Sequence, residues 1–348
     1  MLWFVGLGIS GLEGTSVNAI QVLKKADMTF FENFTSPIGK SEVLKIKKLV
    51  KGKMTIAPRW MVEDGKAILA FAKKKNVVLL AYGDPYVATT HLELRTRAEK
   101  DKIKTKTIHN ASAITSLIGE CGLHHYKIGR PVTIMRETPS LTTVYHTIYE
   151  NMIKGSHSLL ILEFDNSSNF FLDPKDALSS LLETEKGQKR NVIDQSTFAI
   201  VASRIGAKNQ KIISGKLSTL VKTDFGKPPH TIIIPGRLHF TESDAIKIFS
   251  QCLDEPFDNS SKIQKISDQM LSKYVPKARK ALDEVVKMFK NDASLGPVIE
   301  NAQLYIDDAE KFQKDGQEEL AVLSIGYAEG LMDALRLSRG IDPWAQSL

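Results

Sequence analysis

The sequence is poor in the features that define several classes of protein. It has only two cysteines, Cys121 and Cys252, among 348 residues, too few for a disulfide framework or a four-thiolate metal site. No apolar run approaches the length of a membrane-spanning helix. The apolar N-terminus has no basic segment before it, so it predicts a first strand and not a signal peptide. We therefore expect a cytoplasmic protein without a membrane partner.

Several catalytic and binding motifs are absent as well. The chain has neither a Walker sequence nor a GxSxG nucleophile elbow. No basic run is interleaved with aromatic residues, so direct nucleic-acid binding is not expected. His124 and His125 are adjacent, which does not suit metal ligation, and no neighbouring acid or cysteine completes a set. The sequence therefore predicts no metal site.

The composition is that of a globular protein whose charge is unevenly distributed. Hydrophobic residues make up 42% and charged residues 25%, and the net charge is +7. From Lys262 onward the chain carries 12 Lys and Arg against 14 Asp and Glu. The basic excess therefore lies in the earlier part, which fits either an acidic or nucleic-acid-associated partner or simply a solvated basic surface.

The first 110 residues alternate between strand-like and helix-like patterns. A helical pattern covers residues 15–25. Apolar runs typical of strands cover residues 2–5, 28–31, 77–81 and 103–108. Such alternation predicts βαβ units around a mainly parallel sheet. We expect residues 1–110 to form an α/β domain.

The rest of the chain predicts two further domains. Residues 111–255 contain strand-like runs punctuated by Gly and Pro, which indicate a second α/β domain with a mixed sheet. The polar segment Asp254–Ser261 is typical of a linker. Residues 262–340 predict a bundle of three amphipathic helices, whose apolar stripes we interpret as core. The last of these stripes consists of Leu320, Leu323, Tyr327, Leu331 and Leu335.

The most informative stretch is AYGDPYVATTHLELRTR, which begins at Ala81. It follows a buried strand, and its Gly-Asp-Pro sequence turns the chain sharply before a helix capped by Thr89 or Thr90. Asp84 is thereby placed at the carboxyl edge of a strand, where open α/β sheets bind their ligands. His230, at the entry of a later strand, follows two prolines and is a second candidate for ligand contact.

A glycine motif near the N-terminus leaves two interpretations open. Gly6–Gly11 reads GLGISG, a GxGxxG sequence between a strand and a helix, and Glu32 ends the next strand. This arrangement predicts a nicotinamide or flavin dinucleotide, with Glu32 at the ribose. The same glycines would equally form a tight turn that lets another ligand, or the opposite domain, approach the backbone.

Residues 1 to about 250 closely resemble the archaeal diphthine synthase family, which belongs to the tetrapyrrole-methylase-like class. The resemblance rests on GLG at Gly6, on the stretch from Ala81, and on later segments. These are HNAS at His109, GLHHYKIG at Gly122, HSLLILEFD at His157 and DFGKPPHTIIIPGRLHFTESD at Asp224. The acidic helical tail resembles an archaeal domain of unknown function that also occurs alone.

The resemblance implies a cofactor, S-adenosyl-L-methionine, in a cleft between the two α/β domains. The implied cofactor contacts are Ile9, Asp84, Val87, Ser112, Ala113, Leu162, Ile205 and His230. Three positions depart from the family's usual residues. Ile9 is commonly Leu, Ala113 is commonly a larger aliphatic residue, and Ser203 is commonly Ala. Contacts made through the backbone at Ile9 and Ala113 would survive these changes.

The resemblance also implies the reaction. Members of the family repeatedly methylate the amino group of a 3-amino-3-carboxypropyl-histidine on translation elongation factor 2, which gives diphthine. The family further implies a homodimer, and it identifies no catalytic side chain. Three alternatives are a porphyrinoid methyltransferase of the same class, a nucleotide-dependent dehydrogenase, and an adaptor whose α/β part is degenerate.

Overall fold

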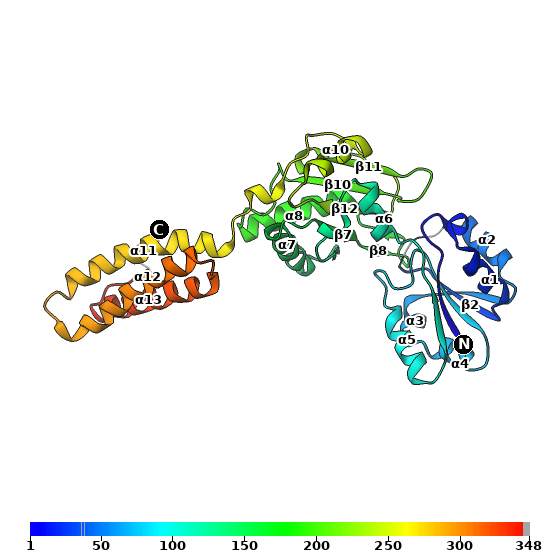
Figure 1. The fold of residues 1–348 in the computed structure, drawn as a ribbon, viewed down its shortest axis with the longest axis horizontal. Coiled ribbons are helices and arrows are strands. Elements are labelled where there is room, and N and C mark those ends of the chain that lie inside the picture. The colour runs from blue at the N-terminus through cyan, green and yellow to red at the C-terminus, as the bar shows by residue number, and fades with distance from the viewer. Residues whose placement is uncertain (36, 38, 344–348) are drawn as a thin grey trace. The chain divides into compact units, whose positions relative to one another are not determined.

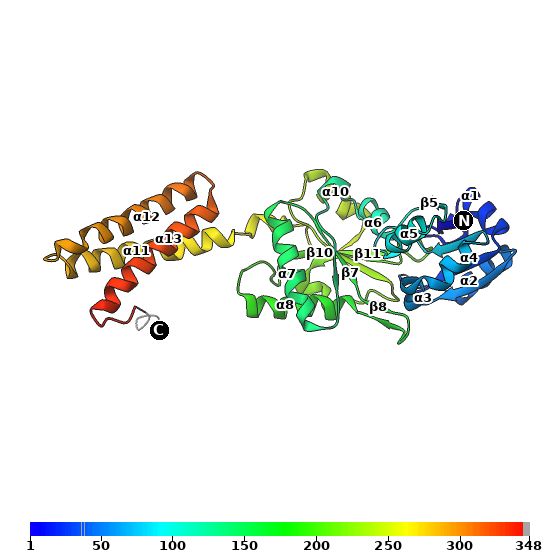
Figure 2. The same cartoon turned by 90° about the horizontal axis from the view of Figure 1, so that it is seen from below.

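The structure, a computed structural model, describes residues 1–35, 37 and 39–343. They fall into two compact units that meet between Ile263 and Gln264. The first unit contains two α/β domains with a sheet each, and the second is helical (Figures 1 and 2). The tetrapyrrole-methylase-type fold predicted from the sequence is confirmed.

The first sheet has five parallel strands in the order β3-β2-β4-β1-β5. The strands are β1 (Leu2–Gly6), β2 (Met28–Glu32), β3 (Lys53–Ala57), β4 (Val77–Ala81) and β5 (Thr105–Ile108). Every residue of β2 and β4 is buried. This explains their continuous apolar sequences, because a parallel sheet is covered by helices on both faces.

Helices cover the two faces of this sheet (Figure 1). One apolar cluster joins the sheet to α1 (Val17–Lys25) and α2 (Lys40–Leu49). Another joins it to the helices α3 (Arg59–Asp64), α4 (Lys66–Ala72) and α5 (His91–Lys100). Helix α5 begins after Thr90, whose side chain makes no capping hydrogen bond. Thr89 does not cap it either, because its hydroxyl donates to the carbonyl of Pro85 at 2.5 Å.

The second sheet is mixed, with the order β13-β11-β10-β12-β7-β6. The strands are β6 (Val132–Ile134), β7 (Ser158–Leu162), β10 (Phe198–Ser203), β11 (Lys211–Lys216), β12 (His230–Ile234) and β13 (Gln251–Cys252). Strand β12 runs antiparallel to both of its neighbours, β10 and β7. A short hairpin, β8 (Phe164–Asp165) and β9 (Phe170–Phe171), follows β7.

Helices also flank the second sheet. The larger apolar cluster joins it to α7 (Thr138–Ile153), α8 (Pro174–Gln188) and α9 (Leu217–Leu220). The other cluster joins it to α6 (Ala113–Glu120) and α10 (Phe240–Phe249). Short 3₁₀ helices occur as η1 (Gly11–Gly14), η2 (His125–Lys127), η3 (Asn259–Lys262) and η4 (Ala293–Leu295).

The segment expected to be a linker is anchored at its end to the second α/β domain. Asn259 is 4% exposed. Its side chain accepts from the amide of Phe198 at 2.8 Å and donates to the carbonyls of Phe198 and Pro235 at 2.9 and 2.6 Å. The first unit therefore extends to Ile263, because an asparagine that satisfies three buried backbone groups is part of the domain that supplies them.

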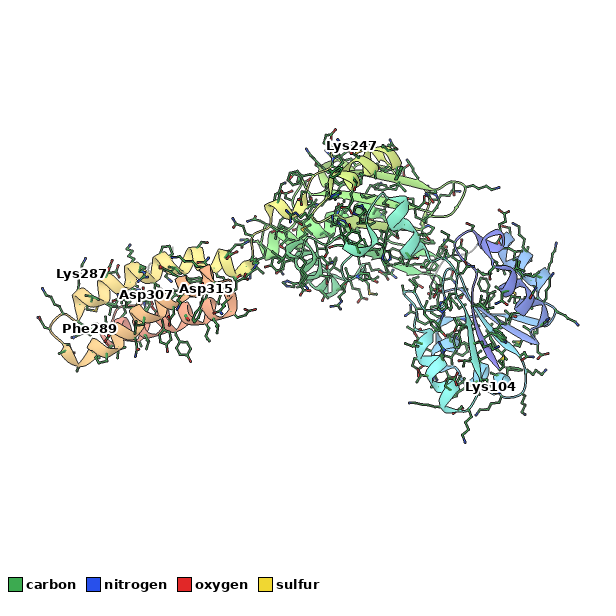
Figure 3. All side chains as sticks on the ribbon, viewed as in Figure 1. Lys104, Lys247, Lys287, Phe289, Asp307 and Asp315 are labelled. Atoms are coloured by element: carbon green, nitrogen blue, oxygen red, sulfur yellow. The ribbon has the colours of Figure 1, made fainter. Side chains whose placement is uncertain are left out.

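The second unit packs α11 (Ile266–Met288), α12 (Gly296–Lys314) and α13 (Glu318–Ser338) around one apolar core. At its surface, Arg279 of α11 contacts Asp307 of α12 at 2.6 Å (Figure 3). Phe289, also labelled there, lies under the Arg339 guanidinium at 4.8 Å. No helix among the described residues is long and apolar enough to cross a membrane.

The apolar stripe expected on the third helix is only partly core, so this interpretation was wrong in part. Leu335 is buried, but Leu320, Leu323 and Tyr327 are 44%, 57% and 56% exposed. The core of α13 instead consists of Ala321, Ile325, Ala328, Met332 and Leu335. The reason is geometric: a spacing of four advances about 40° beyond a full turn, so a row at that spacing drifts across the helix.

Candidate active site

The glycine motif forms one wall of the site by packing against the Gly-Asp-Pro loop. Gly8 and Gly83 exchange two backbone hydrogen bonds, with N–O distances of 3.1 and 3.0 Å. A Cβ on Gly6 would lie 2.5 Å from the carbonyl oxygen of Gly83. Gly8 also has a φ of +79°, which glycine adopts without strain. These glycines serve close backbone contact between two loops at the carboxyl edge of the sheet.

The groups that a dinucleotide would need are engaged by the chain itself. The Glu32 carboxylate is buried and accepts from the amides of Phe34 and Thr35 at 3.1 Å each. The Glu42 carboxylate accepts from the amide of Leu12 at 2.5 Å, at the start of η1. A ribose-binding acid and a free helix N-terminus are thus both lacking in this turn, and the dehydrogenase interpretation loses its support.

Asp84 ties the loops after β4 and β5 together. Its Oδ1 accepts from the amide of Tyr86 at 2.9 Å, and its Oδ2 accepts from the amide of Asn110 at 3.2 Å. His109 Nδ1 lies 2.8 Å from the same Oδ2. The Asn110 side chain in turn donates to the carbonyl of Gly6 at 3.3 Å. Asp84 is 6% exposed, so it fixes the shape of the edge.

A cavity of about 580 Å³ lies beside these loops. Six of the eight residues expected at the cofactor line it, from both α/β domains. They are Val87, Ser112, Ala113, Leu162, Ile205 and His230. Ile9 lines an adjoining cavity of about 270 Å³ that shares Tyr82, Pro37 and Ala207 with the first. Asp84 lines neither of the two cavities, although it holds the loop on which Val87 lies.

His230 is held at the cavity wall by its strand neighbour. It lies opposite Ser203 in the β10–β12 register, and Ser203 Oγ is 2.8 Å from His230 Nδ1. Burial, and then the nearby charge of Arg204, lower the pKa of His230, so its imidazole is neutral near pH 7. The Arg204 guanidinium itself is fixed by the carbonyls of Asn209 and Phe225, at 3.0 and 3.4 Å.

Other residues of the cavity were not anticipated from the sequence. Tyr82 lines both cavities, and its hydroxyl donates to the carbonyl of Ile9 at 2.5 Å. Thr35 and Arg204 also line the larger cavity. Tyr82 directly follows a predicted strand inside the Gly-Asp-Pro stretch, and this position was a signal for it. Thr35 carried no such signal, because its place depends on the turn that Glu32 closes.

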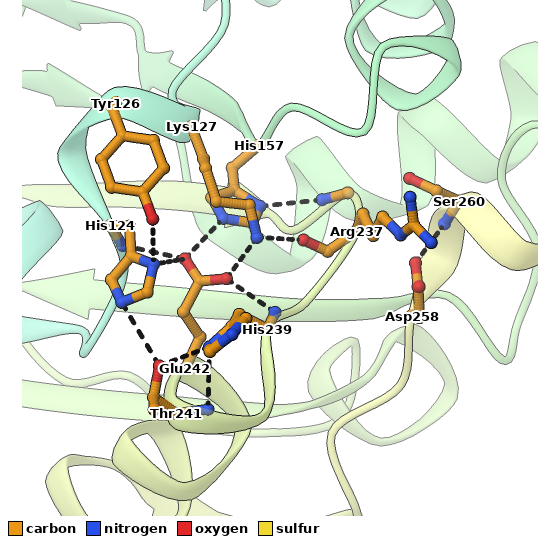
Figure 4. Close-up of polar contacts among 11 residues, drawn as sticks. His124, Tyr126, Lys127, His157, Arg237, His239, Thr241, Glu242, Asp258 and Ser260 are labelled. Carbon is orange, nitrogen blue, oxygen red and sulfur yellow. Dashed lines mark hydrogen bonds and ion pairs between the residues drawn. The ribbon is translucent and has the colours of Figure 1, made fainter.

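A buried polar network lies apart from the cavity lining and holds three loops of the second α/β domain (Figure 4). Glu242 and His157 are both fully buried, with His157 Nε2 at 2.9 Å from Glu242 Oε1. His157 Nδ1 accepts from the amide of Gly236 at 3.0 Å, so Nε2 carries the proton. Glu242 also accepts from the Lys127 ammonium and from the amides of His124 and His239.

This network fixes the protonation of its two central groups. Burial lowers the pKa of His157. Burial alone would raise the pKa of Glu242, but the hydrogen bonds that it accepts lower this pKa to about 2. The network therefore holds a neutral histidine against a carboxylate. No group of three metal-ligating side chains occurs in the part of the chain that the structure describes.

Comparison with known proteins identifies the family. Residues 1–221 match the tetrapyrrole (corrin/porphyrin) methylases, and residues 273–340 match a family of proteins of unknown function, DUF357. The diphthine synthase of Methanocaldococcus jannaschii is 36% identical over 71% of this chain and 98% of its own length. The chain belongs to the diphthine synthase family. It is therefore an S-adenosylmethionine-dependent methyltransferase, as the sequence predicted.

Two further relatives of this diphthine synthase family member agree. The diphthine methyl ester synthase of Dictyostelium discoideum is 33% identical over 72% of this chain and 98% of its own length. A crystal structure of diphthine synthase superposes with a TM-score of 0.64 and 28% identity, covering 75% of this chain and 99% of that one. These relatives match the α/β unit, whereas the helical unit matches DUF357 and is an addition to it.

Proposed function

We propose that this enzyme methylates the amino group of a 3-amino-3-carboxypropyl-histidine on translation elongation factor 2 and so forms diphthine. One observation carries the proposal: a largely apolar cavity opens at the Gly-Asp-Pro edge of a chain that shares 36% of its residues with a diphthine synthase. The family resemblance also supports a cytoplasmic homodimer as its working form. A porphyrinoid substrate remains the rival within the same class of enzymes.

The cavity suits S-adenosylmethionine in size and chemistry. Its volume of about 580 Å³ lies in the range of roughly 300–1,000 Å³ for small-molecule sites. The glycine turns need no phosphate at the edge, because Leu12 N is already bonded to Glu42. We assign the cofactor to the residues already expected. They are Ile9, Asp84, Val87, Ser112, Ala113, Leu162, Ile205 and His230.

Different residues of this set have different tasks in the proposal. The apolar side chains of Val87, Leu162 and Ile205 exclude water from the reacting atoms. Ser112 has its hydroxyl bonded to the amide of Ile114 at the start of α6, which fixes this part of the wall. Asp84 keeps one lone pair on Oδ1 beyond its bond to Tyr86, and we assign that lone pair to a polar group of the cofactor.

The chemistry needs alignment more than acid–base catalysis. When bound, S-adenosylmethionine supplies a methyl group on a sulfonium centre, whose leaving group needs no further activation. Of the described residues that line the larger cavity, the titratable ones are Tyr82, Arg204 and His230. Tyr82 and Arg204 are bonded to backbone carbonyls. We therefore assign the cavity the task of holding the acceptor amine in line, with water taking its proton.

A second product is favoured by one relative. The Dictyostelium protein is named a diphthine methyl ester synthase. Its product carries a methyl group on the carboxylate of the same modified histidine, a second nucleophile beside the amine. Our primary proposal is methylation of nitrogen alone, and an additional ester is the alternative.

The experiment compares the two products directly. The enzyme is incubated with S-adenosylmethionine and elongation factor 2 that bears the aminocarboxypropyl-histidine, and the modified peptide is fragmented in a mass spectrometer. Methyl groups confined to the amine support the proposal, and they withstand mild alkali. A methyl group that alkali removes would establish the ester. A peptide without methyl groups, alongside tight S-adenosylhomocysteine binding, would keep the class of enzyme and reject the substrate.

A further inference from the structure

Helix α13 carries an exposed apolar row that its own bundle does not cover. Its residues alternate at spacings of three and four, and all are exposed. They are Leu320, Leu323, Tyr327, Gly330, Ala334 and Leu337, which we call the α13 seam. Leu337 is 49% exposed, much like the three large residues given above. Alternating spacings of three and four define the contact face of a coiled coil, so the seam has the pattern of a surface that packs against another helix.

The small residues of the seam are not required by the bundle. A Cβ on Gly330, or on Gly326 beside the seam, would meet nothing within 4 Å. Glycine in the middle of a helix lowers helix stability, so its presence needs a reason. Crowding inside the unit does not supply one. Close approach of a second helix backbone does.

We propose that the α13 seam pairs with the α13 seam of a second copy of this chain, with the two helices antiparallel. A two-fold axis between Ala328 and Glu329 places Tyr327 of one copy opposite Gly330 of the other. By the same symmetry Leu323 faces Ala334, and Leu320 faces Leu337. Large side chains thus meet small ones on a self-complementary surface, which a two-fold dimer requires.

A parallel pair would fit less well. It would place Tyr327 against Tyr327 and leave Gly330 opposite Gly330, so crowding and a void would alternate along the seam. The antiparallel pair avoids both defects. Tyr327 is also pre-positioned for its seat, because its ring stacks on Tyr305 of α12 at 5.3 Å between centroids. A large side chain held in place loses less entropy when it is buried.

Charge favours the same arrangement. The seam contains no charged residue, and the two ends of the helix differ in sign. Glu319 is exposed at the first turn and Arg339 is exposed directly after the last. An antiparallel pair brings Glu319 of one copy to the end where Arg339 of the other lies, and it opposes the two helix dipoles. A parallel pair would bring like charges together.

Cross-linking tests the register of the pair in the full chain. Single variants Tyr327→Cys and Gly330→Cys, both with Cys252→Ser, are mixed and oxidised. We expect a disulfide-linked dimer from the mixture and far less from either variant alone, because only unlike positions face each other. A mixture of Tyr327→Cys with Leu337→Cys is the mismatched control. Equal cross-linking in both mixtures, or stronger linking of Gly330→Cys to itself, would overturn the proposal.

Sedimentation tests the association itself. Gly330→Glu should fold, because glutamate favours helix and the added side chain has open space around it. We expect this variant to dissociate at concentrations where the unchanged chain is associated. Gly187→Glu, on an exposed and equally open glycine of α8, is the matched control and should leave association unchanged. A chain that is monomeric at all concentrations, or association unaffected by Gly330→Glu with no matched cross-link, would contradict the seam.

Discussion

Ser203 and His230 lie opposite each other on two antiparallel strands and share a hydrogen bond of 2.8 Å at the wall of the cavity. The serine therefore orients the imidazole, whose pKa is lowered first by burial and then by Arg204. The cavity thus presents a neutral ring with one nitrogen already engaged. This arrangement gives His230 a fixed direction toward a ligand and makes its contribution measurable.

His230→Ala is expected to weaken binding of S-adenosylhomocysteine about tenfold, the effect of one lost hydrogen bond of about 1–1.5 kcal/mol. Isothermal titration calorimetry measures it. Ser203→Ala is the matched control, because it keeps the ring and removes only its orientation, so the loss should be smaller. An unchanged dissociation constant for His230→Ala would remove this residue from the cofactor site.

Asp84→Ala is expected to weaken cofactor binding by roughly tenfold to a hundredfold. The substitution leaves the amides of Tyr86 and Asn110 without their acceptor, at a cost of about 1–3 kcal/mol for buried groups. Asp84→Asn keeps one acceptor oxygen and should lose less. Calorimetry with S-adenosylhomocysteine decides the matter, and full affinity in Asp84→Ala would refute a role in cofactor binding.

A chain that ends at Ile263 is expected to fold and to bind S-adenosylhomocysteine as the full chain does. The cavity is lined entirely by residues before this point, and the helical unit has its own core. Failure of the shortened, folded chain to bind would show that the helical unit takes part in cofactor binding.

Asn259→Ala is expected to lower the free energy of unfolding by about 1–3 kcal/mol, since it leaves backbone groups of Phe198 and Pro235 unpaired. Chemical denaturation of the chain that ends at Ile263 isolates this effect. Ser261→Ala, at an exposed neighbouring residue, is the control and should change little. Equal stability of the two variants would return this segment to the role of a linker.

Stability is expected to fall as the pH drops below about 6.5. Burial lowers the pKa of His157 beneath its ordinary value of 6.5, so below that pH the unfolded chain binds more protons than the folded one. The contribution is complete above pH 6.5 and is lost as the pH falls toward the folded pKa. Glu242, with a pKa of about 2, adds a contribution that is lost only below its ordinary 4.5.

Denaturation of His157→Gln tests this sign. The variant lacks one of the groups that take up a proton on unfolding, so its stability should depend less steeply on pH between 6.5 and 5. His125→Gln, at an exposed histidine of η2, is the matched control and should keep the slope of the unchanged chain. A slope that stays the same in His157→Gln would mean that the buried ring does not titrate as its surroundings imply.

The parts of the fold that were predicted correctly are those whose signal is local. Strand β4 is apolar throughout because both of its faces are buried, and the turn at Gly83 follows directly. Asp84 could therefore be placed at the sheet edge from the sequence. Whether its carboxylate faces a ligand or the chain could not, because its partners Tyr86 and Asn110 come from loops whose approach is tertiary.

The parts that were missed depend on contacts between distant segments. Glu32 has the spacing of a ribose-binding acid, yet it closes its own turn. Glu242 and His157 lie far apart in the chain, and no local pattern connects them before the fold does. The exposed seam of α13 was taken for core because Leu320, Leu323 and Tyr327 are apolar at helical spacing, and spacing alone does not say which face the bundle covers.

The most direct test is the intact mass of elongation factor 2 bearing the aminocarboxypropyl-histidine, measured before and after incubation with this enzyme and S-adenosylmethionine. The account predicts successive methyl increments that require the cofactor and diminish when Asp84→Ala replaces the unchanged enzyme at limiting cofactor. An unchanged mass with the folded, cofactor-binding enzyme would contradict the assignment of this substrate.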